Sequence, residues 1–174
     1  MPEEKSFRNS AEPKASRPYM PGYGLLDAQS GKGLLPLSWA VERLAEGHNY
    51  WVATTRPDGR PHAMPVWGVW FEDRFYFSSG EQSRKAKNIA EDPRCVVGTE
   101  RGTDAVVIEG VAELVMEEAV RRRFAELYSR KYQWDMEGFG EPIYAVRPSV
   151  VFGLTSSLVE TATRWVFDEE NRRT

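Results

Sequence analysis

The sequence predicts a mainly β, α+β fold in which six to seven mostly antiparallel strands form a small β-barrel with peripheral helices. Short runs of β-branched and aromatic residues recur along the chain, and turns containing Gly or Pro separate them. With 174 residues, of which 41% are hydrophobic, the chain is long enough to bury one sizeable core.

Seven segments have the composition of strands: residues 49–55, 61–71, 74–78, 94–99, 105–116, 143–154 and 163–167. Turn signals at 56–60 (R-P-D-G-R) and at Glu72-Asp73 join the first three into an antiparallel meander. Pro65 cannot donate to a strand ladder, so the second segment is expected at a sheet edge or an opening. Gly110 interrupts the fifth segment and predicts a bulge or bend.

Three segments are expected to be helices. The first covers residues 39–46, with Ser38 as its N-cap. A short second helix follows residues 78–80 and stops at Asp92-Pro93. The third covers residues 117–132 and has one apolar stripe.

Residues 1–36 show no helical or strand period and hold five of the 11 prolines (Pro2, Pro13, Pro18, Pro21 and Pro36). They are expected to form an extended, proline-rich N-terminal arm, and the folded domain then covers residues 37–174. The arm is either a disordered tail or a segment that wraps a partner subunit.

Composition excludes several classes of function. The formal net charge is −3 and the pI about 5.6, whereas a nucleic-acid partner generally requires a basic surplus. No apolar run reaches membrane-spanning length and the N-terminus lacks the apolar core of a signal peptide, so a cytoplasmic protein without a membrane partner is expected. The single cysteine, Cys95, excludes an internal disulfide and a multi-cysteine metal site.

The stretch from Ser78 to Asp92 (S-S-G-E-Q-S-R-K-A-K-N-I-A-E-D) is the most informative part of the chain. A helix N-terminus offers unpaired N–H groups and a partial positive charge, and both favour an anion. Polar side chains gather at this helix start: Ser78, Ser79, Ser83, Arg84, Lys85, Lys87 and Asn88. The simplest ligand is a phosphate carried by a cofactor, and a solvated basic helix face is the alternative.

No protein group suited to acid–base or nucleophilic catalysis stands out. The chain has two histidines, His48 and His62, and neither has a metal-binding spacing. Cys95 is expected to be a small apolar strand residue, and neither a nucleophile elbow nor a dinucleotide-binding glycine motif is present. This combination favours chemistry performed by a cofactor. The segment Met64-Pro65-Val66-Trp67 provides a flat apolar slot for a flavin-like ring.

Four motifs follow one another along the chain: Y-W-V-A-T-T-R-P-D-G-R-P-H at residues 50–62, P-V-W at 65–67, S-R-K-A-K-N-I at 83–89 and D-P-R at 92–94. In order and spacing they resemble the pyridoxamine-phosphate-oxidase-like flavin and deazaflavin reductases, which share the FMN-binding split β-barrel fold. The resemblance covers residues 37–167.

The resemblance implies a homodimer with two cofactor sites at the subunit interface. It assigns the cofactor phosphate to Lys85 and Asn88, together with Ser78, Ser79 and Ser83. It also places the 64–67 strand beside the cofactor ring and lets Trp165 line the pocket from the closing strand.

The spacing of Lys85 and Asn88 is more similar to the branch that uses the deazaflavin cofactor F-420 than to true pyridoxamine-phosphate oxidases. Those oxidases carry an Arg-rich strand before the phosphate helix, and residues 74–77 (R-F-Y-F) lack that pattern. The resemblance therefore implies an oxidoreductase that uses F-420 or FMN and transfers hydride to or from a small organic substrate.

Two alternatives remain open from the sequence. One is a non-enzymatic module that binds or stores a flavin or a haem-like ligand, and the other is a structural homodimer with a degenerate site. A planar apolar substrate is suggested by the residues expected to line the slot: Met64, Trp67, Trp70 and Trp165.

Overall fold

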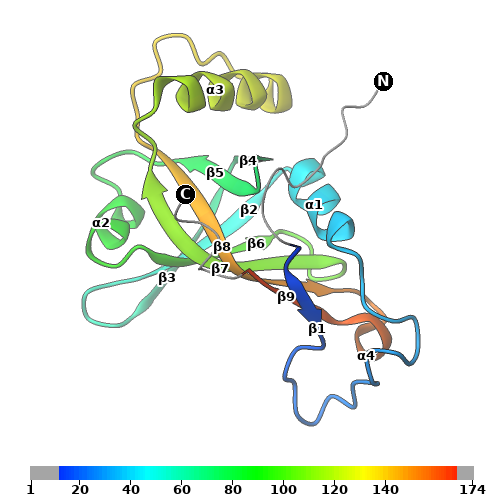
Figure 1. The fold of residues 1–174 in the computed structure, drawn as a ribbon. Helices are drawn as coiled ribbons and strands as arrows, with labels where there is room; N and C mark the ends of the chain where they lie inside the picture. Colours follow the sequence, from blue (N-terminus) through cyan, green and yellow to red (C-terminus); the bar gives the residue numbers. More distant parts are fainter. Residues whose placement is uncertain (1–11, 168–174) are drawn as a thin grey trace.

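The computed structural model describes residues 12–167, and within this range nine β-strands form one antiparallel sheet with four helices around it (Figure 1). The strands are β1 (Lys14–Ser16), β2 (Tyr50–Thr55), β3 (Pro61–Val66), β4 (Gly68–Phe71), β5 (Arg74–Ser78), β6 (Arg94–Thr99), β7 (Ala105–Leu114), β8 (Ile143–Leu154) and β9 (Thr163–Val166). The helices are α1 (Leu37–Glu46), α2 (Arg84–Glu91), α3 (Glu118–Tyr132) and α4 (Leu158–Thr161). The predicted mainly β, α+β fold is confirmed.

The sheet has more strands than the six to seven expected, for two reasons. The N-terminal arm supplies β1, which pairs with β9. The segment predicted as one strand over 61–71 divides at Trp67, because β3 pairs with β2 whereas β4 pairs with β5. Gly68 follows the break, and its N–H and C=O both bond to the phenol of Tyr132, which holds the chain in this bend.

Strand order along the sheet is β1-β9-β8-β7-β6-β2-β3, with the β4–β5 hairpin attached to β8 through β5. The long strand β8 pairs with different strands along its length, since residues 143–146 pair with β5 and residues 150–153 pair with β9. The irregularity predicted at Gly110 is confirmed, because the register of β7 against β8 shifts between Glu109 and Gly110. β3 ends the order, which is the edge position that Pro65 predicted.

Helix α1 begins earlier than expected, and the N-cap role predicted for Ser38 is wrong. Pro36 occupies the N-cap position with an extended backbone, and no side chain caps this helix. The C=O of Pro36 accepts a hydrogen bond from the N–H of Trp39 (3.0 Å), so the first turn already has an acceptor for one of its free N–H groups.

Two clusters of buried apolar side chains join the sheet to the helices. The larger one lies between the sheet, α1 and α2, and it includes Phe75 and Trp165. The smaller one includes Phe124 of α3. Ala86 and Ile89 belong to the larger cluster, so the apolar face of α2 is fixed against the sheet.

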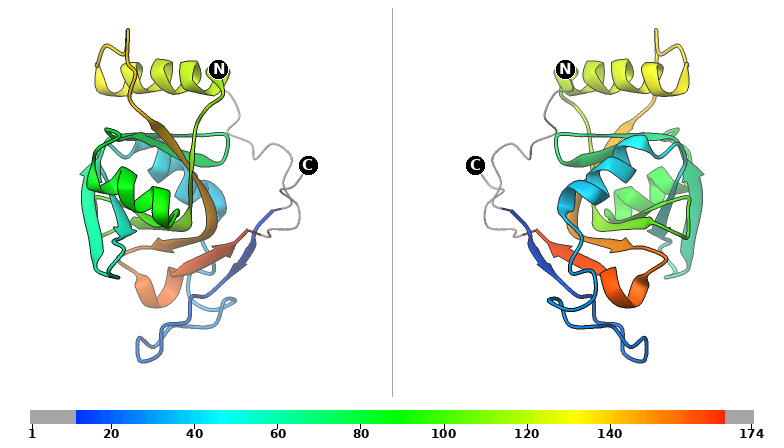
Figure 2. Two further views of the ribbon diagram at one scale, coloured as in Figure 1. Left: turned by 90° about the vertical axis from the view of Figure 1, so that its left-hand side faces the viewer. Right: turned by 90° about the vertical axis from the view of Figure 1, so that its right-hand side faces the viewer.

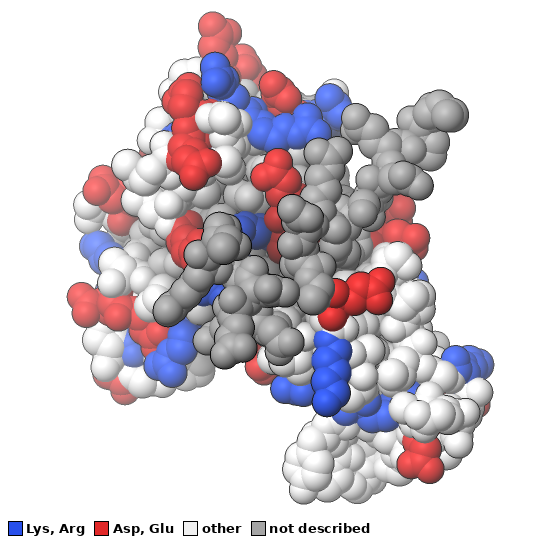
Figure 3. All heavy atoms as spheres, viewed as in Figure 1, with Lys and Arg blue, Asp and Glu red and all other residues white. Residues whose placement is uncertain are grey.

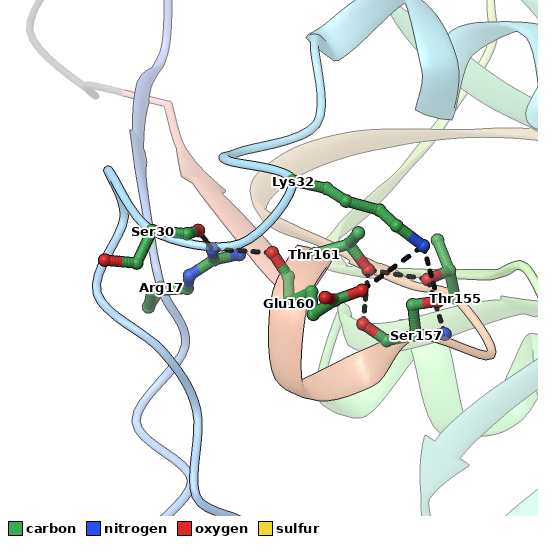
Figure 4. Close-up of polar contacts among 7 residues, drawn as sticks. All are labelled: Arg17, Ser30, Lys32, Thr155, Ser157, Glu160 and Thr161. Atoms are coloured by element: carbon green, nitrogen blue, oxygen red, sulfur yellow. Dashed lines mark hydrogen bonds and ion pairs between the residues drawn. The ribbon is translucent and has the colours of Figure 1, made fainter.

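One side chain fastens the N-terminal arm to the C-terminal end of its own chain. The guanidinium of Arg17 donates to five backbone carbonyls at 2.7–3.4 Å, those of Leu26, Asp27, Ser30, Glu160 and Ala162. Lys32 adds an ion pair with Glu160 (3.2 Å) and a hydrogen bond to Ser157 (3.1 Å) (Figure 4). These contacts tie residues 17–32 to α4 and to the start of β9.

The arm and α4 form a lobe that projects away from the rest of the sheet (Figure 1, Figure 2). The tip of this lobe is largely uncharged, whereas acidic and basic side chains are mixed over the rest of the described surface seen in Figure 3. Residues 1–11 of the predicted arm and residues 168–174 of the predicted domain lie outside the described residues. The division of the chain at residue 36 stays a prediction.

Gly68→Ala should destabilise the fold, because a Cβ at this position meets the ring of Phe75 and lies 2.7 Å from the backbone oxygen of Tyr76. We expect a loss of about 1–3 kcal/mol in the free energy of unfolding, the usual cost of overpacking. Gly98→Ala, in β6, is the matched control, since a Cβ there has no heavy atom within 4 Å. Chemical denaturation measures both variants, and equal stability of the two would contradict the close packing at Gly68.

Candidate functional site

Helix α2 begins at Arg84 with Ser83 as its N-cap, later than the start expected directly after residues 78–80, so Ser83 lies before the helix and not in its first turn. The Ser83 hydroxyl accepts a hydrogen bond from the N–H of Ala86 (3.1 Å) and bonds to the hydroxyl of Ser79 (2.8 Å). The hydroxyl of Ser78 donates to the C=O of Pro142 (2.8 Å). The three predicted serines therefore hold the loop before α2 in one shape. The N–H groups of the first helical turn lack intrahelical acceptors, which favours an anion here.

Cationic side chains surround this helix start. Lys85 is half-buried, which lowers the pKa of its amine, and Arg84 is exposed beside it. Burial lowers the pKa of the His62 imidazole, and Arg56 in the turn after β2 lowers it further together with Lys85 and Arg84, so these three cations act on one imidazole. Between residues 12 and 167, no carboxylate lies within ion-pair distance of the three cations. The three cations therefore have no ion-pair partner in the described chain, and the carboxylate of Glu141 lies at the loop before α2, 3.5 Å from the place of a Cβ on Gly80.

The side chain of Asn88 is fully buried at the contact between α2 and β2. Its amide Nδ2 donates to the hydroxyl of Thr54 on β2 (2.9 Å). Its Oδ1 has no hydrogen-bond partner among the described residues. Leaving a buried polar atom unsatisfied costs about 1–3 kcal/mol, so a donor supplied by a ligand or by solvent would complete this side of the site.

The 64–67 segment, predicted to flank a cofactor ring, runs from the edge strand β3, which also carries His62, to the bend at Trp67. Met64 and Trp67 are 47% and 40% exposed, and Pro65 is exposed as well, whereas Val66 is buried. Helix α2 lies beside the β2–β3 hairpin (Figure 1, Figure 2). The 64–67 segment is thus largely exposed at the sheet edge, on the hairpin beside which α2 lies, and its place beside a cofactor ring stays a prediction.

An aromatic cluster beside Trp67 was not predicted from the sequence. Trp67 and Tyr132 stack with ring centroids 4.6 Å apart and planes inclined by only 3°. Tyr128 and Trp134 flank Trp67, each with its centroid 6.2 Å away. The available signal was the four-residue spacing of Tyr128 and Tyr132 on one helix, which puts both rings on one face.

Lys131 lies against this cluster and was also missed. Its ammonium donates to the phenol oxygen of Tyr50 (2.8 Å) and to the C=O of Gly68 (2.9 Å). Burial lowers the pKa of this amine to about 8. Lys131 thereby links α3 to the start of β2 and to the bend before β4.

Trp165, predicted to line the pocket, lies in the core of its own chain and is 2% exposed. Gly153 makes room for it, since a Cβ at that position would lie 2.8 Å from Trp165 Cη2. Trp70, which was expected to line the slot, is partly buried against the same cluster. Both rings pack the interior here, whereas most of the 64–67 segment is at the surface.

The remaining chemical candidates have structural roles. Cys95 is buried, which raises the pKa of its thiol to about 12, in line with its predicted place in a strand. Glu113 pairs with Arg74 (2.8 Å) and Arg147 (3.2 Å). In the part of the chain that the structure describes, no group of His, Cys, Asp and Glu side chains could hold a metal ion, and no helix is long and apolar enough to cross a membrane.

Lys131→Met should remove a pH dependence of stability. The pKa of this amine is about 8 in the folded protein and 10.5 ordinarily, so between these values the unfolded chain binds more protons than the folded protein. The stability of the parent protein should therefore rise relative to the variant from pH 8 to pH 10. Thermal unfolding across this range measures the effect, with exposed Arg130→Met as control. If the melting temperatures of the parent and of Lys131→Met changed with pH in parallel, the lowered pKa of the buried Lys131 amine would be refuted.

Solved structures from several bacteria share the fold, among them the three that follow. A conserved hypothetical protein from Mycobacterium tuberculosis is 20% identical, with a TM-score of 0.62 over 76% of this chain and 85% of that one. A FAD-binding protein from Mesorhizobium loti is 16% identical, with a TM-score of 0.57 over 76% and 96%. The haem storage protein HutZ from Vibrio cholerae is 14% identical, with a TM-score of 0.53 over 64% and 86%. At these identities the likeness shows the fold alone.

Comparison with curated proteins gives no match. Comparison with protein families matches residues 40–161 to the family described as pyridoxamine 5'-phosphate oxidase. The match includes all of β2 to β8, the start of α2 and its cations, and the 64–67 edge segment. It covers most of the sequence, so the chain belongs to the pyridoxamine 5'-phosphate oxidase family.

Proposed function

We propose that this protein is an oxidoreductase that binds a flavin-type cofactor, F-420 or FMN, and transfers hydride to or from a small organic substrate. One observation carries the proposal: Arg56, Arg84 and Lys85, which have no ion-pair partner among the described residues, act together on the imidazole of His62, and the edge strand that carries His62 continues into the exposed Met64 and Pro65. The family match supports it, and one structural neighbour is a FAD-binding protein.

In this proposal the cofactor phosphate binds at the start of α2. Burial already disfavours the charged form of Lys85, so an anion beside it gives the ammonium a partner that water no longer supplies. The hydroxyl of Ser78 uses its only hydrogen on Pro142 and therefore shapes the loop. Ser79 and Ser83 share one hydrogen between them, which leaves the second free to donate to the phosphate.

The isoalloxazine or deazaflavin ring would lie along the 64–67 segment, where the exposed side chains of Met64 and Trp67 offer apolar contact. A bound flavin or deazaflavin supplies the hydride chemistry, which the described side chains do not provide. The residues of the protein would bind the cofactor and the substrate and orient them toward each other. The aromatic cluster around Trp67 extends the same surface and suits a planar apolar substrate.

We also propose that the protein is a homodimer. Strand register puts Trp51 and Pro65 on one face of β2 and β3, together with Ala53, Ala63 and, from β6, Val96. Trp51 is 48% exposed and Val96 is 36% exposed, so this face is both apolar and open. A second copy would bury it, and the 64–67 segment at its edge would then lie at the subunit interface.

Lys85→Ala should weaken cofactor binding by about tenfold to a hundredfold, since a hydrogen bond to a charged group contributes about 1.5–3 kcal/mol. Lys87→Ala is the matched control, because Lys87 is an exposed cation on the same helix. Fluorescence titration of each variant with FMN and with F-420 measures the affinities and also identifies the preferred cofactor. Equal affinities for Lys85→Ala and the parent protein would exclude the phosphate site at α2.

Trp51→Glu should convert the dimer to a monomer and reduce cofactor binding with it, because a carboxylate on the apolar face cannot be buried cheaply. Sedimentation velocity measures the oligomeric state, and Met116→Glu, at a residue that is 77% exposed outside this face, is the control. A Trp51→Glu protein that stays dimeric would place the subunit interface elsewhere.

The second candidate is a module that stores a flavin or a haem-like ligand, because the haem storage protein HutZ shares the fold. The visible spectrum of the loaded protein separates the two candidates. Flavin or deazaflavin absorption together with reduction of the cofactor by a substrate supports the oxidoreductase, whereas a Soret band supports haem storage.

A further inference from the structure

We propose that His62 is a pH-sensitive ligand of the anion site: its imidazole takes up a proton from solvent when a phosphate enters, and then holds that phosphate as a cation. The proposal rests on the proposed function, since it concerns the same site at α2. Sequence patterns alone give His62 no role beyond the start of a strand.

A chain of hydrogen bonds fixes His62 relative to α2. His62 pairs with Thr54 across the β2–β3 ladder, and the Thr54 hydroxyl donates to the C=O of His62 (3.5 Å). The same hydroxyl accepts from the buried amide of Asn88 on α2 (2.9 Å). The imidazole is therefore carried by a strand that is tied to the helix whose start carries the cations.

The charged groups that act on the imidazole are all cations. They are Arg56 from the turn after β2, and Arg84 and Lys85 from α2; no carboxylate contributes. Asp58, the acid of the same turn, is paired with Arg60 (2.8 Å). Partial burial and the three cations lower the pKa of His62 below its ordinary value of 6.5, so the ring is neutral near pH 7.

The imidazole also has an unused polar atom. Its Nδ1 is buried and has no hydrogen-bond partner among the described residues, so the ring is not committed to another group through this atom. A neutral imidazole beside three cations is the expected state while no anion is present, because a fourth positive charge would be repelled.

A bound phosphate reverses this balance. Its negative charge offsets the cations around the ring and favours the imidazolium, so the pKa of His62 rises and one proton is taken up. Protonation in turn adds a charge-assisted hydrogen-bond donor to the site. Cofactor affinity should therefore gain from His62 at low pH and lose that gain as the pH rises through the raised pKa.

Proton NMR of the two histidine rings tests the proposal directly, with His48→Gln to assign the signals. In the protein alone, His62 should titrate below 6.5. With saturating FMN, F-420 or inorganic phosphate, its pKa should rise by about one unit or more, which corresponds to a tenfold change in proton affinity. Riboflavin, which lacks the phosphate, should leave it unchanged. A pKa that stays the same with all three phosphate-bearing ligands bound would overturn the proposal.

His62→Gln gives an independent measurement, with His48→Gln as the matched control. The ratio of the FMN affinity of the parent protein to that of His62→Gln should fall about tenfold between pH 6 and pH 8, and the ratio cancels the titration of FMN itself. A ratio that does not change with pH, in a His62→Gln protein with parental thermal stability, would count against His62.

These outcomes distinguish a failure of the role proposed for His62 from a failure of the proposed function. If FMN or F-420 binds and Lys85→Ala weakens binding, but neither the His62 pKa nor the affinity ratio responds, only the role of His62 is lost. If none of the phosphate-bearing ligands binds the parent protein, the phosphate site and the proposed function are lost together.

Discussion

One buried hydrogen bond, from the amide of Asn88 to the hydroxyl of Thr54, sets the geometry of the site. It fixes α2 to β2 through a side chain with no exposed surface, and apolar contacts of Ala86 and Ile89 complete the contact. Removing one partner of such a bond leaves the other buried without a hydrogen bond, which lowers the free energy of unfolding by about 1–3 kcal/mol. Because α2 is held there, Arg84 and Lys85 act on the imidazole of His62 together with Arg56, and all the chemistry proposed for the site depends on that proximity.

Charged side chains are paired elsewhere in the fold but not at the candidate site. Glu113 forms ion pairs with Arg74 and Arg147, and Lys32 forms one with Glu160. At the start of α2 the cations have no acidic partner among the described residues, although Lys85 is half-buried. Such an arrangement destabilises the protein alone, and a bound anion relieves it, so the same charges that weaken the empty site increase the gain from binding.

Two predictions that depended on local backbone chemistry were accurate. Pro65 lies in an edge strand, and the β7–β8 register shifts at Gly110. Each follows from what one residue does to its own hydrogen bonds. The strand expected over 61–71 divides because its two halves pair with different strands, which its local pattern could not show. The local capping prediction for Ser38 was wrong, since α1 begins at Leu37 after Pro36.

The sequence by itself determined the fold class, the presence of a short helix after residues 78–80 and the edge position of the strand that contains Pro65, since these depend on residues close together along the chain. The tertiary structure alone decided that Arg56 and His62 join Lys85, that Trp165 packs the interior, and that Lys131 is buried beside Tyr50. The physical reason is that charge and burial act through space. A side chain's pKa and its accessibility depend on strands and helices that meet only when the sheet has formed.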